Sequence, residues 1–431
     1  MLHPNVALLG GLLALVQQPV APPPDAEPVP ANDAAYARLK PSLFTVEVVP
    51  VAGEDKRSLG SAYVAGTGGR LITNYHVVGA YIEAPERYRL RVRSDTRTFD
   101  ARLRSFDLIN DLAVLEAPID APALRLAPEP GSPGSHVIAF GNPSGLGLSL
   151  IEGVFNGLAA HGFVDRLLLS MPLNAGMSGG PILNDRREVI GTNVSVSWRE
   201  NSLSFGVPAA KAIALLEKPP LETTKTALLA ETNRQLAELD RLVDARVVEP
   251  FLAGNGQPVN VGRTRMPHLP EAFECWNDSQ EHEKEQLTKT SYRCNLQFTP
   301  SLESVEEVGS IEILAEHFTT RTAPYGFYGM LAAHAESHHG IEAREPGNGM
   351  MSPPKCVSDR VRGSALTWKV STCVYGYDKY PGFGYFSLVA TSLVAPREAA
   401  FVAVYGRGVT LEPFVKISRR LLDQVRLEPQ P

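Results

Sequence analysis

The chain has 431 residues, of which 44% are hydrophobic and 20% charged, and its formal net charge is −6 at pH 7. At about 100–200 residues per domain, this length allows two or three globular units, each able to bury a core. The ordinary apolar content excludes a chain disordered throughout, and the slight acidic excess supplies no broad basic surface for nucleic acid or anionic lipid. No apolar run reaches the ~20 residues of a membrane-spanning helix, so we expect no integral membrane domain.

Residues 1–35 are predicted to be a signal-like segment followed by a Pro-rich leader. The apolar run Val6–Val16 has the length of a signal-peptide core and is short for a membrane anchor. Little positive charge precedes it and no clear A-x-A cleavage site follows, so a leader without an export function stays open as an alternative. Frequent prolines between Pro19 and Pro30 predict an extended tether. We expect a periplasmic or secreted protein of the bacterial envelope.

Residues 36–218 consist of short apolar segments separated by Gly, Pro, Asn and Asp. Examples are LFTVEVVPV, RLITNYHVV, DLAVLEA, HVIAFGN and EVIGTNVSV. Short strands with regular turn signals are typical of an all-β barrel or sandwich. A brief helix at Lys211–Glu217 is expected to close this unit.

Residues 219–248 are predicted to form a linker with an amphipathic helix. After the stiff Lys218-Pro219-Pro220 break, Leu229, Leu236 and Val243 recur at a seven-residue interval and form one apolar stripe. The stripe can dock on a domain core, which is the commoner case, or pair with a second copy in a homo-oligomer.

Residues 249–431 are predicted to form a C-terminal α+β domain of unknown role. All four cysteines lie here: Cys275, Cys294, Cys356 and Cys373. The absence of a C-x-x-C pair argues against a zinc ribbon or a thioredoxin-type site. The sequence permits three pairings, of which the two local pairs, Cys275–Cys294 and Cys356–Cys373, are the simplest, and four free thiols are the alternative.

The segment AAHAESHHG contains three histidines. On a helix, His334 and His338 lie one turn apart on the same face and could hold a metal, with Glu336 on another side. The sequence shows no further ligand and Gly340 ends the segment, so we interpret it as an exposed polar helix end and expect no metal site.

Three segments of the β-rich unit each supply one member of a nucleophilic triad. His76 follows a predicted strand in LITNYHVV, Asp111 directly precedes one in NDLAVLE, and Ser178 lies in the Gly-lined turn NAGMSGGPIL. A serine hydroxyl needs a base to remove its proton during attack, and a carboxylate on the other imidazole nitrogen fixes the tautomer of that base. Asp107 competes with Asp111, but it lies in the loop before the apolar strand.

The glycines around Ser178 indicate an oxyanion hole. Gly176 can adopt the backbone conformation that turns its N–H toward a developing oxyanion, and the N–H of Ser178 would be the second donor. Gly179 and Gly180 would let neighbouring chain segments approach closely.

These motifs resemble those of HtrA-type (Do-like) serine proteases, within the trypsin-like class. AFGNPSGLGLSLIEGVFNGL and LSFGVPA are similar to two further segments of that family, so the resemblance extends from Leu43 to about Ala210. It implies a chymotrypsin-like pair of six-stranded antiparallel β-barrels, with His76 and Asp111 from the first barrel and Ser178 from the second. The PDZ domains common in that family are not indicated in the C-terminal half.

Two departures from the family bear on the substrate cleft. Met177 stands before the nucleophile where Asn is usual, and Pro172-Leu173 occupy the place where an Asp would select basic side chains in trypsin-type enzymes. We expect a pocket formed by Leu173, Asn193, Val194 and Ser195 that accepts small or medium apolar P1 side chains and not Lys or Arg.

The sequence therefore predicts a serine endopeptidase that acts through an acyl-enzyme on Ser178 without a cofactor. The resemblance implies unfolded proteins or peptides as substrates and a role in envelope protein quality control. The alternative is a latent protease-fold peptide sensor or adaptor that acts through its C-terminal domain.

Overall fold

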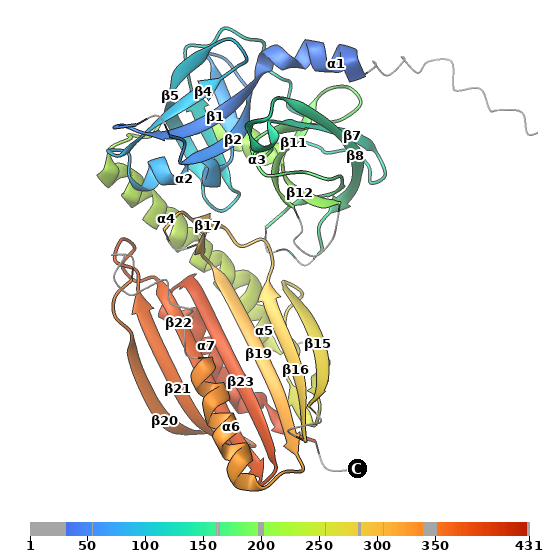
Figure 1. Ribbon diagram of the computed structural model, residues 1–431, viewed down its shortest axis with the longest axis vertical. Helices are drawn as coiled ribbons and strands as arrows, with labels where there is room; N and C mark the ends of the chain where they lie inside the picture. Colours follow the sequence, from blue (N-terminus) through green and yellow to red (C-terminus); the bar gives the residue numbers. More distant parts are fainter. Residues whose placement is uncertain are drawn as a thin grey trace, which may run out of the picture.

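The computed structural model describes residues 32–428, except residues 54, 161, 163, 197–201, 255, 283–285, 305 and 339–350. The expected signal core at Val6–Val16, most of the leader and His339 lie outside the described residues. Two β-rich units lie one above the other, and a long helix runs from the first into the second (Figure 1). Within the described ranges, no helix is both long and apolar enough to cross a membrane.

The first unit contains two closed antiparallel barrels, as the sequence predicts. A short helix, α1 (Asn32–Leu39), and the turn η1 (Lys40–Ser42) precede the first barrel, whose strand order is β1-β2-β3-β6-β5-β4. Its strands are β1 (Leu43–Pro50), β2 (Ser58–Val64), β3 (Arg70–Thr73), β4 (Tyr88–Arg93), β5 (Thr98–Asp107) and β6 (Leu112–Glu116). Between β3 and β4, the sequence YHVVGAYIE forms helix α2 (Tyr75–Glu83), which the strand pattern did not predict.

The second barrel has the strand order β10-β11-β12-β9-β8-β7. Its strands are β7 (His136–Gly141), β8 (Ser149–Leu158), β9 (Leu167–Ser170), β10 (Pro181–Leu183), β11 (Val189–Val196) and β12 (Leu203–Pro208), with the turn η2 (Pro143–Gly145) after β7. Helix α3 (Ala209–Leu216) closes the unit within two residues of its predicted position. Buried residues of both barrels, such as Ile72 and Phe140, share one apolar cluster, so the barrels pack directly on each other.

Helix α4 (Lys225–Val243) connects the two units and begins with a cap in which the Thr224 side chain accepts a hydrogen bond from Ala227 N. Leu228, Leu236 and Leu239 are fully buried within the chain, in one apolar cluster with the first barrel and the C-terminal unit. The apolar stripe therefore docks on this chain's own core, which is the commoner of the two alternatives. The helix continues as η3 (Asp244–Val248) and α5 (Glu249–Ala253) and ends at Gly254, whose φ of 73° favours glycine.

The C-terminal unit is a seven-stranded antiparallel sheet with the order β15-β16-β19-β23-β22-β21-β20. Helix α6 (Pro324–Ser337) covers one face and α7 (Leu411–Gln424) the other (Figure 1). The sheet strands are β15 (Phe273–His282), β16 (Leu287–Leu296), β19 (Ser310–Thr320), β20 (Lys355–Arg362), β21 (Thr367–Gly376), β22 (Gly384–Ala395) and β23 (Glu398–Val409). Smaller elements are the three-stranded sheet of β13 (Val259–Val261), β14 (Thr264–Met266) and β24 (Arg426–Leu427), and the hairpin β17 (Ser301–Leu302) with β18 (Glu306–Glu307).

Two disulfides join neighbouring strands near opposite edges of this sheet. Cys275 in β15 bonds to Cys294 in β16, and Cys356 in β20 bonds to Cys373 in β21. These are the two local pairs that the sequence favours. Each bond closes a short loop between strands that already pair in register, so it restrains the unfolded chain in the native pairing.

Replacing both Cys356 and Cys373 with serine is expected to lower the free energy of unfolding by roughly 3 kcal/mol, because the unfolded chain regains the entropy of that loop. Chemical denaturation of the oxidised parent and the double variant measures the difference. The fully reduced parent serves as the control and should be at least as destabilised as the variant. Equal stability of variant and oxidised parent would contradict the expectation.

Candidate active site

His76 and Asp111 are in direct contact across the first barrel. His76 lies in the first turn of α2, and its Nδ1 is 2.7 Å from Asp111 Oδ2. The backbone N–H of His76 also donates to Asp111 Oδ1 at 2.9 Å. The Asp111 carboxylate thus contacts both the start of the helix and the imidazole of His76. These two contacts fix the ring orientation and favour the tautomer protonated at Nδ1.

Asp111 adopts an uncommon backbone conformation with a φ of 60°. Asn74, which immediately precedes α2, stabilises it by donating from Nδ2 to the Asp111 carbonyl at 2.8 Å. The competing residue, Asp107, instead accepts hydrogen bonds from the backbone and side-chain N–H groups of Asn110 at 2.9 and 2.8 Å. Asp107 therefore stabilises the turn, whereas Asp111 contacts the imidazole.

Ser178 lies in a turn that packs against the segment before His76. Its carbonyl accepts a hydrogen bond from Ser61 N at 2.7 Å. A Cβ on Gly179 would lie 2.1 Å from the Ser61 carbonyl oxygen and 2.4 Å from Thr73 Oγ1, and one on Gly180 would lie 1.9 Å from the Phe140 carbonyl oxygen. Both positions require glycine, because only a residue without a Cβ lets the turn approach the first barrel at Gly179 and strand β7 of the second barrel at Gly180 this closely.

The backbone amides of Gly176 and Ser178 are available as donors. Gly176 has a φ of 93°, and its carbonyl accepts from Ser61 Oγ at 2.8 Å. Within the described part of the chain, neither amide donates to a protein oxygen. The hydroxyl of Ser178 donates to the Val194 carbonyl at 3.0 Å, and no hydrogen bond joins it to His76, which is also a described residue. The serine must therefore rotate before it can transfer its proton to His76.

The predicted pocket residues differ in what they contact. Leu173 is buried among apolar residues of the second barrel, where its N–H approaches Ser204 Oγ. Asn193 is also buried, but its Nδ2 donates to the carbonyls of Phe140 and Met177, so its side chain supports the nucleophile turn. Val194 contributes its carbonyl to Ser178, and the side chain of Ser195 lies outside the described residues. A cavity of about 540 Å³ lies elsewhere along the barrels, and His76, Asp111 and Ser178 are not among its lining residues.

The sequence did not single out Arg166, which lies close enough to Asp111 for their charges to interact. Its side chain is buried just before β9. Burial lowers the pKa of its guanidinium, and the carboxylates of Asp111 and Asp107 oppose that shift. Arg166 thus places a buried positive charge close to both carboxylates.

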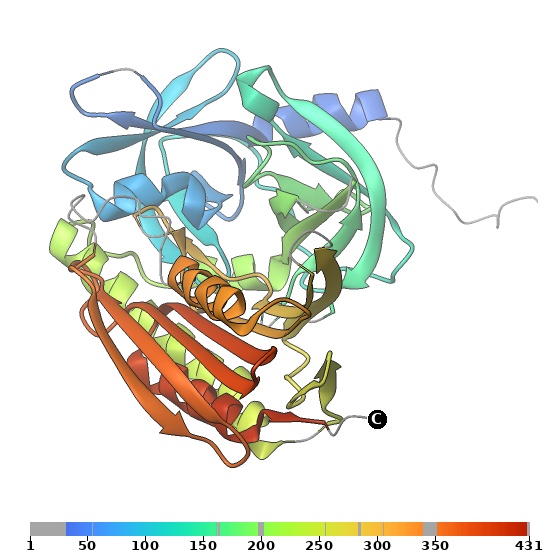
Figure 2. The ribbon, with the colours of Figure 1, turned by 60° about the horizontal axis from the view of Figure 1, so that its bottom comes forward.

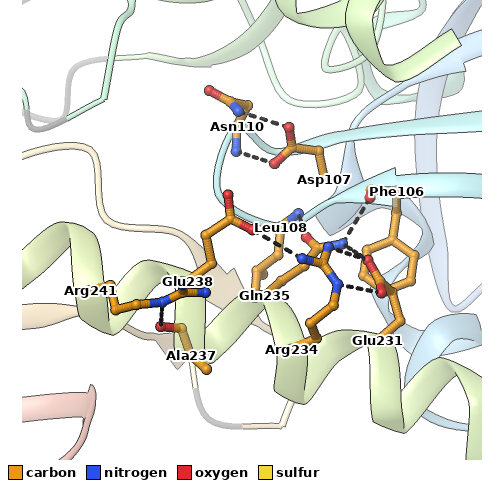
Figure 3. A network of polar contacts seen from close by, with 10 residues as sticks. All are labelled: Phe106, Asp107, Leu108, Asn110, Glu231, Arg234, Gln235, Ala237, Glu238 and Arg241. Atoms are coloured by element: carbon orange, nitrogen blue, oxygen red, sulfur yellow. Dashed lines mark hydrogen bonds and ion pairs between the residues drawn. The ribbon is translucent and has the colours of Figure 1, made fainter. Parts of the chain in front are cut away.

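Gln235 on α4 was also missed, although it holds the turn that carries Asp111. Its Oε1 accepts from Leu108 N at 2.6 Å, and its Nε2 donates to the Phe106 carbonyl at 3.0 Å (Figure 3). A third hydrogen bond, from Nε2 to Glu231 Oε1, orients the amide. The linker helix thus satisfies two buried backbone groups of the β5–β6 turn, which a sequence pattern based on apolar periodicity cannot reveal.

The C-terminal unit contacts the helix that carries His76 (Figure 2). Glu83, at the end of α2, accepts hydrogen bonds from Ser304 N at 3.0 Å and Lys379 Nζ at 2.9 Å. In the β17–β18 hairpin, Glu303 forms an ion pair with Arg57 of the first barrel. A second contact reaches the other barrel, where the rings of Phe298 and Phe205 of β12 lie 4.7 Å apart in an edge-on arrangement.

These contacts influence the protonation of His76. Burial alone would lower its pKa, but the charge and hydrogen bond of Asp111, together with the charge of Glu303, raise the pKa above its ordinary value of 6.5. A base must be neutral to accept the serine proton. We therefore expect kcat/KM to rise with pH as His76 loses its proton. The midpoint of this rise, the acidic limb of the pH profile, should lie above the ordinary histidine pKa of 6.5.

Glu303→Gln is expected to move this acidic limb to lower pH, because it removes one of the negative charges that favour protonated His76. The pH dependence of kcat/KM on a peptide substrate measures the shift. Glu307→Gln, a neutralisation in the same hairpin, is the matched control and should leave the limb in place. A limb that stays unchanged in Glu303→Gln would show that the C-terminal carboxylate has no influence on the imidazole.

Comparison with known proteins identifies the class of the first unit. Residues 60–191 match the family model of the trypsin-like peptidase domain. The chain is 34% identical over 188 residues to Protease Do-like 1, chloroplastic, of Arabidopsis thaliana. The aligned region covers 39% of this chain and 40% of the relative. It is 28% identical over 248 residues to a probable periplasmic DegP-like serine endoprotease of Ectopseudomonas mendocina. This alignment covers 50% of this chain and 51% of the relative.

A solved structure, the serine endoprotease from Yersinia pestis, matches with 26% identity and a TM-score of 0.38, covering 44% of this chain and 66% of the other. Most of the double-barrel unit thus matches the trypsin-like peptidase domain. The chain is similar to HtrA-type, or Do-like, serine proteases. The chain spans about half or less of the length of these curated relatives.

Proposed function

We propose that this protein is a serine endopeptidase with Ser178 as nucleophile, His76 as general base and acid, and Asp111 as the residue that orients His76. The observation that carries the proposal is the double contact of the Asp111 carboxylate with His76, through Nδ1 at 2.7 Å and the backbone N–H at 2.9 Å. With Nδ1 protonated, Nε2 keeps the lone pair that accepts the serine proton.

Catalysis then proceeds through two steps of acyl transfer. Ser178 Oγ leaves the Val194 carbonyl, gives its proton to His76 Nε2 and forms a bond to the substrate carbonyl carbon. The N–H groups of Gly176 and Ser178 stabilise the oxyanion, a contribution worth about 10²–10³-fold in rate for one donor. His76 returns the proton to the leaving amine, and water, deprotonated by the same imidazole, releases the acyl group.

We further propose that the substrates are unfolded proteins of the periplasm or of another extracytoplasmic space. Two lines support this location: the periplasmic assignment in the names of several relatives, and the two disulfides of the C-terminal unit, which persist in oxidising compartments. Leu173 is buried among apolar side chains of the second barrel, and it follows Pro172 at the place where an Asp would select basic side chains, which favours small or medium apolar P1 side chains. Cleavage of a P1-varied peptide library checks this preference, and a strong preference for Arg would reject it.

A second candidate function is a latent protease-fold peptide sensor or adaptor. The hydrogen bond of Ser178 Oγ to the Val194 carbonyl favours it, because the hydroxyl in that position is not directed at the base. The contacts of the C-terminal unit with α2 give a route by which a bound partner could change the active site.

Labelling with a fluorophosphonate distinguishes the two candidates. An active triad phosphonylates Ser178 stoichiometrically without any added partner, and Ser178→Ala abolishes both labelling and cleavage of unfolded casein. Thr192→Ser, a conservative change on β11 outside the triad, is the matched control that should label normally. A parent chain that neither labels nor cleaves casein would contradict the endopeptidase and support the latent sensor.

A further inference from the structure

Three side chains that commonly bind metals converge between α6 and the sheet of the C-terminal unit. They are Glu316 of β19 and His334 and His338 at the end of α6, and one potential ligand atom from each lies within 4.8 Å of the other two. Glu316 lies on the same face of β19 as Leu314 and Phe318, which belong to the apolar cluster beneath α6. We propose that this cluster is a zinc site, with two imidazoles and one carboxylate as ligands and a water in the fourth position.

The surroundings of His338 favour the tautomer that a metal needs. The Tyr405 hydroxyl lies 2.7 Å from His338 Nδ1 and donates its own proton to the His338 carbonyl at 3.3 Å. The tyrosine oxygen therefore accepts the Nδ1 proton, which leaves Nε2 with a free lone pair. Hydrogen bonding of the second ring nitrogen to a fixed acceptor is the usual outer-shell arrangement of zinc-bound histidines.

Glu316 is held with one oxygen directed at His334. The side chain is 3% exposed, and its Oε1 accepts from Ser291 Oγ at 3.1 Å and lies 3.6 Å from Lys289 Nζ. Its Oε2 is 2.5 Å from His334 Nε2, so the proton of a hydrogen bond lies between the two ligand atoms. Zinc would replace that proton, with the two atoms separating to about 3.3 Å around a tetrahedral ion whose Zn–N and Zn–O bonds are about 2 Å.

The rings of Phe318 and Phe401 restrict the histidines further. Both pack edge-on against His334, at centroid distances of 5.1 and 4.8 Å, and Phe401 also lies 5.1 Å from the His338 ring. An apolar wall on one side of a preformed set of ligands limits the entropy lost on binding. Two imidazoles and one carboxylate suit zinc, whereas magnesium and calcium prefer sets made only of oxygen. Bound zinc would fix the end of α6 on the sheet.

The sequence predicts no metal here, because it shows only His334 and His338 on one face of a helix, with Glu336 on another side. The third ligand lies 18 residues before His334 and is brought close only by the packing of α6 on β19. This site belongs to the C-terminal unit and does not depend on the proposed protease activity.

Zinc binding to the full chain tests the proposal, with Ser178→Ala included throughout to prevent self-digestion. Isothermal titration of the chelator-treated protein at pH 7.5 should give one equivalent of Zn²⁺ and a rise in melting temperature. His338→Gln and Glu316→Gln should weaken binding at least ~100-fold, and Tyr405→Phe, which removes only an outer-shell group, should weaken it about 10–100-fold. His282→Gln, at an exposed histidine of β15, is the matched control and should bind as the parent does.

Melting curves of the metal-free variants show whether they are folded, and Tyr405→Phe keeps the test decisive if a ligand variant is not. Cobalt bound at the site should give the visible absorption of a tetrahedral ion, and this absorption should disappear in His338→Gln. Absence of zinc binding in the parent would overturn the proposal. An affinity for zinc that is unchanged in both ligand variants would also overturn it. The same holds if the bound equivalent of zinc is lost only when His76 is replaced, since zinc would then bind at the protease site.

Discussion

Asp111→Asn is expected to lower kcat/KM about 10⁴-fold while the fold is retained. In the parent, Asp111 Oδ1 accepts the hydrogen bond from the backbone N–H of His76. The asparagine oxygen can accept the same hydrogen bond, so the start of α2 keeps its partner. The asparagine amide, however, would donate toward Nδ1 and force the ring proton onto Nε2. In that tautomer His76 cannot accept the proton of Ser178, and the protonated imidazole loses the charge that stabilises it.

Steady-state kinetics on a peptide taken from the casein cleavage sites measure this loss. Asp107→Asn is the matched control, because the Asp107 carboxylate accepts hydrogen bonds from the turn residue Asn110 and not from His76, and its activity should stay within a few-fold of the parent. Retention of more than a tenth of the parental kcat/KM in Asp111→Asn would remove Asp111 from the triad.

Gln235→Leu is expected to lower the free energy of unfolding by roughly 4 kcal/mol and kcat by at least ~10-fold. The substitution leaves the Leu108 N–H and the Phe106 carbonyl buried without partners, and each such group costs about 1–3 kcal/mol. These two groups flank the turn whose end carries Asp111, so the turn should relax and the carboxylate should move relative to His76.

Denaturant unfolding measures the stability, and kinetics well below the melting temperature separate positioning from unfolding. A positioning role predicts a lower kcat with nearly unchanged KM while the protein remains folded. Arg241→Ala is the matched control on the same helix, since Arg241 is exposed and donates only to the carbonyl of Ala237 (Figure 3). A destabilised Gln235→Leu with full kcat would assign Gln235 to stability alone.

The strand pattern of residues 43–207 was sufficient to predict an all-β barrel or sandwich, because alternating burial and turn residues are local properties of the chain. The pair of six-stranded barrels was implied by the resemblance to HtrA-type proteases. The structure confirms the barrels, the closing helix α3 and both local disulfides. The pattern failed at Tyr75–Glu83, where an apolar stretch next to a predicted strand forms helix α2. Six residues of α2 are buried, so its conformation depends on packing against the barrel and α4.

The candidate site shows the same division between local and distant information. His76, Asp111 and Ser178 were proposed because each lies in a recognisable local motif. The direction of the Ser178 hydroxyl, the buried Arg166 and the influence of Glu303 on His76 could not be proposed in that way. Each depends on a partner distant in the chain.

The amino-acid sequence by itself determined the all-β character of the first unit, the catalytic candidates and the simplest cysteine pairing of this protein, since short-range periodicity and motif residues encode them. Only the tertiary structure decided that the stripe of α4 serves the chain's own core, that the C-terminal sheet rests on the helix of His76, and that Glu316 meets His334 and His338. The physical reason is that such contacts depend on how elements pack, and packing joins side chains whose separation along the chain carries no signal of their proximity.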